Sequence, residues 1–264
     1  MYRLFLVLTV IALSFISFTE SKWKEVKKIH VTADFMTTDR LGNLYLVDKN
    51  FIHLYNSNGD SITSFNSRRF GEISSVDATD PYKILVFFSD YNLILYLDNY
   101  LSLNGEELDL QEKDYDQVSL ACQSRTVGLW IFDPLRQKAI HLNANFEADK
   151  ETVNLYQWFG KRINPNFMFE YENQLYIVEK ESGIYQFDHF GTFKKTIPIT
   201  ELTSIQMNDG NISFFKEGKY CMYVERDFKE SCKAISHPKA KNVRIEKNRV
   251  YLFSPEETTI FSTN

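Results

Sequence analysis

The residues best able to do chemistry are few and widely spaced in this sequence. Its five histidines and three cysteines form no HExxH, CxxC or GxSxG motif, and no phosphate-binding glycine loop accompanies them. Catalysis by a zinc ion, an activated serine or a bound nucleotide therefore has no support in the motifs. From the sequence we expect no catalytic residue, no cofactor and no metal.

Molecular recognition is a second kind of chemistry, and two short segments could perform it. Each combines aromatic and cationic side chains beside a glycine, and such side chains dominate the hot spots of protein interfaces. Aromatic rings also stack on sugars. The expected binding residues are Arg68, Arg69, Phe70, Tyr156, Trp158, Phe159, Lys161 and Arg162. The alternative is that Trp158 and Phe159 pack inside the fold.

The charge balance limits the class of partner. The chain carries 30 basic and 35 acidic residues, for a net charge of −5, whereas proteins that grip a nucleic-acid backbone are normally basic. A third segment, residues 111–116, is acidic, so the surface is mixed in sign. We expect a protein or peptide partner, or a glycan, and no nucleic acid.

These segments need a scaffold, and the sequence supplies one by repeating itself. In one copy, residues 44–48, 51–55 and 61–65 are strands, with a tight turn at residues 56–60, which predicts an antiparallel meander. The first of these strands recurs at a spacing of about forty residues, a period typical of a propeller blade. The recurrences are residues 83–88, 128–133, 174–179, 211–215 and 249–253.

Six copies predict an all-β fold, a six-bladed β-propeller with four-stranded antiparallel blades over residues 22–264. The last copy has only three strands, and residues 23–31 read as a spare one. We therefore expect the N-terminal strand to complete the last blade and close the ring, because closure removes exposed sheet edges. The alternative is a β-sandwich, or several small β domains built from the same hairpins.

A metal in the central channel of such a propeller would need oxygen ligands from the innermost strands. On the strands expected there, Asp34 and Asp77 are the only acids, with Asn166 and Gln206 as neutral helpers. A hard cation such as Ca²⁺ takes about six to eight oxygens. Two carboxylates are too few, so the sequence favours no channel metal.

Residues 42–48 read Gly-Asn-Leu-Tyr-Leu-Val-Asp, and this segment resembles the repeat signature of NHL-type propellers. Residues 173–179 and 127–133 echo the same pattern, while the other copies keep only its hydrophobic positions. The resemblance implies a six-bladed propeller. NHL-like propellers include binding modules and a few metal-dependent enzymes, so the resemblance leaves both classes of function open.

The first residues indicate export. After Arg3, residues 4–18 form an almost unbroken apolar run of about fifteen residues, shorter than the roughly twenty that span a membrane. Thr19 and Ser21 suit a signal peptidase. We expect a signal peptide over residues 1–21, a periplasmic or extracellular mature protein, and no stable membrane insertion after cleavage. The alternative is an uncleaved anchor.

An exported chain meets an oxidising compartment, in which cysteines tend to pair. Cys221 and Cys232 flank a turn at Arg226 and Asp227, and counting outward from a two-residue turn places the two cysteines opposite each other. We therefore expect a disulfide between Cys221 and Cys232, with Cys122 left as a free buried thiol.

Three classes of function follow. The first is a non-catalytic interaction or scaffolding module in the cell envelope or outside the cell. The second is a propeller that binds a glycan or small ligand, and the third is a metal-dependent hydrolase or lyase. Carboxylates that converge in the channel would favour the enzyme, and a dry apolar channel would favour the interaction module.

Overall fold

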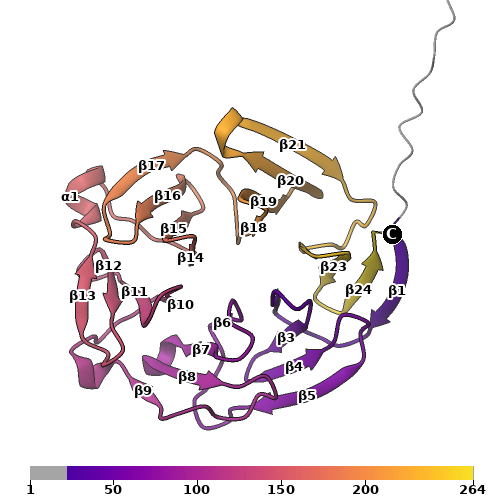
Figure 1. Ribbon diagram of the computed structural model, residues 1–264, viewed down its shortest axis with the longest axis horizontal. Coiled ribbons are helices and arrows are strands. Elements are labelled where there is room, and N and C mark those ends of the chain that lie inside the picture. Colours follow the sequence, from indigo (N-terminus) through magenta and orange to yellow (C-terminus); the bar gives the residue numbers. More distant parts are fainter. Residues whose placement is uncertain (1–22, 264) are drawn as a thin grey trace, which may run out of the picture.

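Six four-stranded antiparallel sheets form a ring in the computed structural model, which describes residues 23–263. The predicted signal peptide, residues 1–21, lies outside the described residues. Figure 1 shows each sheet as a blade, with one of its edge strands near the centre of the ring and the other on the outside. The predicted six-bladed propeller is therefore confirmed, and the sandwich alternative is wrong.

The blades follow one another along the chain. Blade 1 comprises β2 (Phe35–Thr38), β3 (Leu44–Asp48), β4 (Phe51–Tyr55) and β5 (Ser61–Asn66). Blade 2 comprises β6 (Ser75–Asp77), β7 (Ile84–Phe88), β8 (Leu93–Leu97) and β9 (Leu108–Asp109). Blade 3 comprises β10 (Leu120–Gln123), β11 (Leu129–Asp133), β12 (Lys138–Leu142) and β13 (Ala148–Glu151). Blade 4 comprises β14 (Phe167–Tyr171), β15 (Gln174–Glu179), β16 (Gly183–Asp188) and β17 (Phe193–Ile197). Blade 5 comprises β18 (Gln206–Asn208), β19 (Asn211–Lys216), β20 (Lys219–Val224) and β21 (Lys229–Ala234). Blade 6 comprises β22 (Asn242–Glu246), β23 (Arg249–Ser254), β24 (Glu257–Ser262) and β1 (Lys24–Ile29), in order from the centre outward.

The N-terminal strand β1 closes the ring as predicted. It lies outermost in blade 6 and pairs antiparallel with β24, so that Lys28 faces Thr259 and Ile29 faces Thr258. A bulge between Glu25 and Lys27 interrupts the register. Figure 1 shows the two strands side by side. The segments nearest the two ends of the propeller thus share one sheet.

The middle strands of the blades are apolar because both of their faces are covered by neighbouring blades. All five residues of β7 and of β11 are buried, whereas four of the six residues of the outer strand β5 are exposed. Each fully buried aliphatic or aromatic side chain contributes about 1.5–3 kcal/mol to folding. The hydrophobic core is therefore a set of clusters between adjacent blades rather than one central cluster.

Side-chain caps fix the turns between the third and fourth strands of the first four blades. In blade 1 the Asn56 Oδ1 atom accepts from the backbone N–H groups of Asn58 and Asp60, both at 2.9 Å. Asp188 caps the corresponding turn of blade 4 through Phe190 and Thr192. These are Asx turns, which polar residues at these positions favour. Asp98 and Asn143 cap the equivalent turns of blades 2 and 3.

Blade 5 departs from this pattern. Its outer strand β21 is exposed at every residue, and the turn before it is a 3-10 turn, Glu225–Asp227, followed by Phe228 at φ +51°. The turn is therefore longer than the predicted two residues, because Glu225 and Phe228 also belong to it and the strand starts at Lys229. The register is nevertheless the predicted one, because the turn is extended equally on both sides.

In that register Cys221 lies opposite Cys232. The two residues form a disulfide, with Cα atoms 4.1 Å apart and sulfurs 1.99 Å apart. Cys122 is a buried free thiol on β10. Since β21 buries no side chain, the disulfide is the main side-chain link between this strand and its blade.

Among residues 23–263, no helix has the length and apolar character needed to cross a membrane.

Candidate functional site

One end of the propeller carries both expected binding segments, and we call this end the loop face. It is made of the connections from each blade to the next and of the connections between the second and third strands. Residues 67–74 lie between blades 1 and 2, and residues 152–166 between blades 3 and 4. Figure 1 places the two segments at different parts of the ring, so the structure does not join them into one cluster.

The first segment divides into packing and exposed residues. The Phe70 ring centroid lies 5.6 Å from that of Phe88, and Phe70 packs against the core between blades 1 and 2. The Arg69 guanidinium lies 4.9 Å from the Phe70 ring centroid, and its Nη1 atom is 3.1 Å from Glu107 Oε1. Arg68 and Arg69 are exposed. Phe70 is therefore a core residue, and the two arginines remain available to a partner.

A short helix, α1 (Leu155–Phe159), forms the middle of the second segment. Asn154 begins it, because its side chain accepts a hydrogen bond at 2.9 Å from the backbone N–H of Gln157. Gly160 ends it at φ +69°, a conformation that glycine adopts without strain. Leu155 is fully buried and anchors the helix to the propeller.

The aromatic residues of α1 face in different directions. The Phe159 ring centroid lies 4.5 Å from Tyr185 and 5.3 Å from Phe193, so Phe159 packs on blade 4. The Trp158 ring is tilted against that of Phe193, with ring centroids 5.9 Å apart, yet 56% of the residue is exposed. Tyr156 is 52% exposed. The packing alternative therefore describes Phe159, whereas Trp158 and Tyr156 lie at the surface.

Glu179 anchors the connection that follows α1. Its carboxylate accepts from the backbone N–H of Asn164 at 2.9 Å and from the Tyr185 hydroxyl at 2.9 Å, and it pairs with Lys161 Nζ at 3.2 Å. Burial raises the pKa of Glu179, but hydrogen bonds from Ser182, Asn164, Tyr185 and Lys161 outweigh that effect and hold the pKa below its ordinary value. Lys161 is thus engaged in an ion pair, while Arg162 is exposed.

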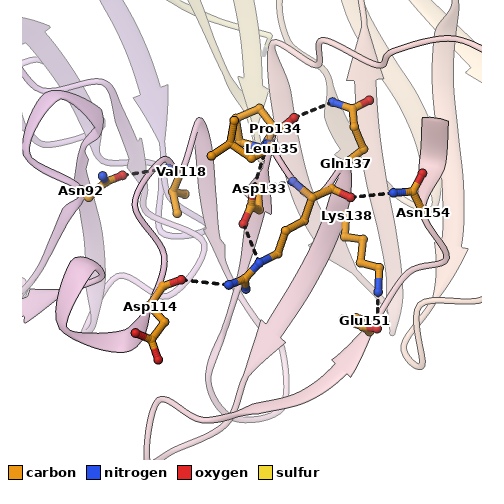
Figure 2. Close-up of polar contacts among 11 residues, drawn as sticks. Asn92, Asp114, Val118, Asp133, Pro134, Leu135, Gln137, Lys138, Glu151 and Asn154 are labelled. Atoms are coloured by element: carbon orange, nitrogen blue, oxygen red, sulfur yellow. Dashed lines mark hydrogen bonds and ion pairs between the residues drawn. The ribbon is translucent and has the colours of Figure 1, made fainter.

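The loop face between blades 2 and 4 is held by a polar network, drawn in Figure 2. Asn92 Oδ1 accepts from the backbone N–H of Val118 at 2.8 Å. Asp133 accepts from the N–H groups of Leu135 and Arg136, both at 2.8 Å, as its position at the end of a strand predicts. The Asn154 side-chain amide donates to the Arg136 carbonyl at 2.9 Å. This network fixes α1 relative to blade 3.

Two exposed residues on the loop face escaped the sequence analysis. Tyr91 and Leu135 are 55% and 57% exposed, each in the connection between the second and third strands of its blade. The sequence could have indicated them, because each is an apolar or aromatic residue within a short polar connection on the loop face.

The central channel contains a cavity of about 710 Å³ lined by the innermost strands of all six blades. Its walls include the partly exposed rings of Phe35, Phe167 and Phe169. Its charged residues are Asp34, Arg40, Asp77, Arg125, Glu170, Lys241, Arg244 and Glu246. The channel is therefore not uniformly apolar.

The expectation that Asp34 and Asp77 are the only acids on the innermost strands is wrong. Strand β14 extends to Tyr171 and β22 to Glu246, which adds Glu170 and Glu246. Glu170 lies between blades 3 and 4 and accepts from Trp130 Nε1 at 2.7 Å and from Ser124 Oγ at 2.9 Å. The channel thus contains twice as many carboxylates as the sequence analysis counted.

These carboxylates are held separately rather than gathered into one site. Asp34 accepts from the backbone N–H of Lys49 at 2.9 Å, and Asp77 from Thr79 and Gln123 at 2.9 and 2.8 Å. Within residues 23–263 the metal-ligand types come close together in one group, Cys221, Glu230 and Cys232. Two members of that group are joined by the disulfide, so it offers no thiolate ligand.

The expected neutral helpers join blades instead of facing an ion. Asn166 donates to the carbonyls of Leu202 and Thr203 at 3.1 and 2.9 Å. Gln206 donates to the Ile245 carbonyl at 2.9 Å and accepts from the Ile245 N–H at 3.1 Å.

Arg244 and Glu246 form the most perturbed charged pair in the channel. Burial lowers the pKa of Arg244 and raises that of Glu246, and in each case the partner's charge opposes the shift. Thr38 links the pair, because its hydroxyl accepts from Arg244 Nε and donates to Glu246 Oε1, both at 2.8 Å. Gln206 Nε2 donates to the same Glu246 oxygen at 2.6 Å.

Comparison with known proteins identifies the fold and no more. No protein-family model matches the sequence, and no curated protein matches it. Virginiamycin B lyase from Staphylococcus aureus has a similar structure, with a TM-score of 0.62 at 11% identity over 91% of this chain and 99% of the lyase. Such low identity shows a shared propeller and carries no information on activity.

Interaction propellers are similar to the same degree. The WD40 domain of Pan2 from Neurospora crassa matches with a TM-score of 0.59 at 8% identity, over 91% of this chain and 95% of that domain. BBS1N, whose structure was solved in complex with ARL6DN, matches with a TM-score of 0.58 at 10% identity, over 92% and 97% of the two chains. The fold thus resembles both lyases and protein-binding propellers, and propellers of this shape occur in protein complexes.

Proposed function

We propose that this chain is an exported, non-catalytic recognition module that binds a protein or peptide through its loop face. The observation that carries the proposal is that Tyr156 and Trp158 are more than half exposed on a helix capped at both ends. Rings presented on a rigid support lose little conformational entropy on binding, which is how interface hot spots work. Arg162, on the same segment, would supply directional hydrogen bonds at the margin, and Arg68 and Arg69 would do so on the part of the loop face between blades 1 and 2.

The arrangement of the channel acids supports recognition over catalysis. Each carboxylate is bonded to donors of its own or a neighbouring blade, so these groups stabilise the ring. The hydrolase or lyase class would rest on the similarity of fold alone. Membership of the NHL type rests on residues 42–48 and stays a proposal.

The disulfide supports export to the periplasm or the extracellular space. Cys221 and Cys232 are placed to pair, and such bonds persist in oxidising compartments and are rare in the cytosol. The sequence of residues 1–21 agrees with this location. A signal peptide and its cleavage after Ser21 remain part of the proposal.

The test is affinity capture from a cell-envelope fraction, with thermal melts recorded for every variant. Trp158→Ala should abolish capture of the partner and leave the melting temperature unchanged, since truncating a hot-spot residue weakens binding by about 2 kcal/mol or more. Tyr82→Ala is the matched control, because Tyr82 is equally exposed at 56% on the opposite end of the propeller. Phe159→Ala should instead lower the melting temperature.

Three results would overturn the proposal. Capture by Trp158→Ala equal to that of the unaltered protein would place the function on another surface. A lower melting temperature for this variant would make Trp158 a core residue. Retention of glycans rather than proteins would favour the glycan-binding class, in which the same rings would stack on sugars.

A further inference from the structure

Arg244 is a cation in the channel wall whose hydrogen-bonding capacity is only partly used. It lies on the innermost strand of blade 6, and its Nε atom donates to Thr38 of blade 1 at 2.8 Å. This bond fixes the plane of the guanidinium. Among residues 23–263, no hydrogen bond or ion pair joins its two Nη atoms to the protein. A partly buried arginine whose two Nη groups are both unpaired is suited to a planar, bidentate anion.

The acids around Arg244 already have donors from the protein. Asp77 and Glu246 are the carboxylates that act electrostatically on Arg244, together with the Tyr220 hydroxyl. Two backbone N–H groups bind Asp77, and Thr38 and Gln206 bind Glu246. The two carboxylates are therefore partly stabilised by hydrogen bonds from the protein. The Nη groups of Arg244 have no hydrogen-bond partner among the described residues.

Part of the cavity wall is apolar and aromatic. Phe167 and Phe169 have ring centroids 5.7 Å apart, and Phe169 stacks on Tyr176 at 5.1 Å with planes 16° apart, which holds the ring in place. Phe35 lines the wall on blade 1. A cavity of about 710 Å³ lies within the range of small-molecule sites, which combine apolar walls with a few polar groups.

We propose that the central channel binds a small organic carboxylate. Its carboxylate accepts two hydrogen bonds from the Nη atoms of Arg244, and its aromatic or aliphatic body packs against Phe35, Phe167 and Phe169. The site lies in the channel, away from the exposed rings of α1, so it goes beyond the proposed function and does not depend on it.

The test compares three probes of nearly equal shape by titration calorimetry on the intact protein. 3-Phenylpropionate should bind, 3-phenylpropionamide should bind at least about tenfold more weakly because it lacks the charge, and 3-phenylpropylamine should not bind. Two results would overturn the proposal. One is equal affinity for the acid and the amide. The other is no binding of the acid at about 10 mM, a concentration well above the dissociation constants of ordinary specific sites.

Variants locate the site. Arg244→Gln should weaken 3-phenylpropionate at least about tenfold, whereas Arg125→Gln, which removes an exposed channel cation, is the matched control and should change the affinity less than about twofold. Unchanged affinity in Arg244→Gln would refute the assignment. If that variant does not fold, Phe169→Leu should weaken the acid and the amide equally, since it removes only apolar contact; unchanged binding of both would refute the site.

Two further probes distinguish the source of the carboxylate. Acetyl-Ala-Ala-Phe with a free C-terminus that binds more tightly than 3-phenylpropionate would identify a peptide end as the ligand. Tighter binding of the small acid would identify a free metabolite. In either case the amidated peptide should bind more weakly than the free one, and equal binding of the two peptides would contradict a role for Arg244.

Discussion

Removing the disulfide of blade 5 should destabilise the propeller by about 3 kcal/mol. Cys221 and Cys232 are separated by 11 positions in the chain, and closing a loop of that length restricts the unfolded chain by about this amount at 25 °C. The side chains of β21 add little, because every residue of the strand is exposed. The loss corresponds to about a hundredfold change in the folding equilibrium constant, or roughly 6–12 °C in melting temperature.

The variant to use is Cys232→Ser, because Cys232 is exposed and serine there creates no cavity. Denaturant and thermal unfolding would be compared for this variant, for the oxidised protein, and for the protein treated with a reductant. The last should behave like Cys232→Ser. Cys122→Ala should retain the response to reductant, since Cys122 is a free thiol. Identical unfolding midpoints for the oxidised protein and Cys232→Ser would refute the reasoning.

Three further predictions follow from the fold. A shortened chain that starts at Ala33 lacks β1 and should melt at a lower temperature, because β24 loses its partner strand and the buried Ile29; an equal melting temperature would contradict ring closure. Gly128→Ala should destabilise the fold by about 3 kcal/mol or more, because the new Cβ atom would lie 1.9 Å from the Leu142 carbonyl oxygen. Gly105 also has a positive φ but has open space around it, so Gly105→Ala should cost only about 1 kcal/mol; thermal unfolding would compare the two variants. The pKa of Glu179 is lowered in the folded protein, so its carboxylate stabilises the fold at pH values above the ordinary glutamate pKa of about 4.3, and this contribution is lost as the pH falls through the folded pKa. Glu179→Gln should therefore be less stable than the unaltered protein at pH 7 and should lose less stability on acidification. Equilibrium unfolding at several pH values would show both effects.

The repeat predicted the blades well because the middle strands are buried on both faces. A strand such as β7 is apolar at every position, and polar turns delimit it, so its limits are visible in the sequence. The spare N-terminal strand was equally visible, since one repeat lacked a partner. The register of Cys221 and Cys232 followed from symmetry about the turn, and it does not depend on the length of that turn.

Two of the innermost strands, β14 and β22, extend further than the sequence indicated, for a physical reason. Their residues alternate between the half-exposed channel wall and the packing between blades, as in β14, so no change from apolar to polar marks where they end. Glu170 and Glu246 were missed in this way. The Nε atom of Arg244 binds Thr38 of the next blade, while its two Nη groups stay unpaired. This arrangement depends on how the two blades are placed, which one sequence does not reveal.

The loop face shows a second limit of sequence. Trp158 and Phe159 are adjacent on one turn of helix, and Trp158 is exposed while Phe159 packs against Tyr185. Their residue types are almost equivalent, so composition cannot separate a binding ring from a packing ring. Only the direction in which α1 sits on blade 4 decides between them.

The pairing of β1 with β24 also governs the order in which the protein can reach its native state. A strand made early in synthesis must wait for one made about 230 residues later, as the pairing of Lys28 with Thr259 shows. Contacts so distant in the chain form slowly. Until then the earlier blades form an open array with unpaired strand edges, which invite association with other chains. The nascent chain therefore depends on protection from aggregation until its last strand has emerged.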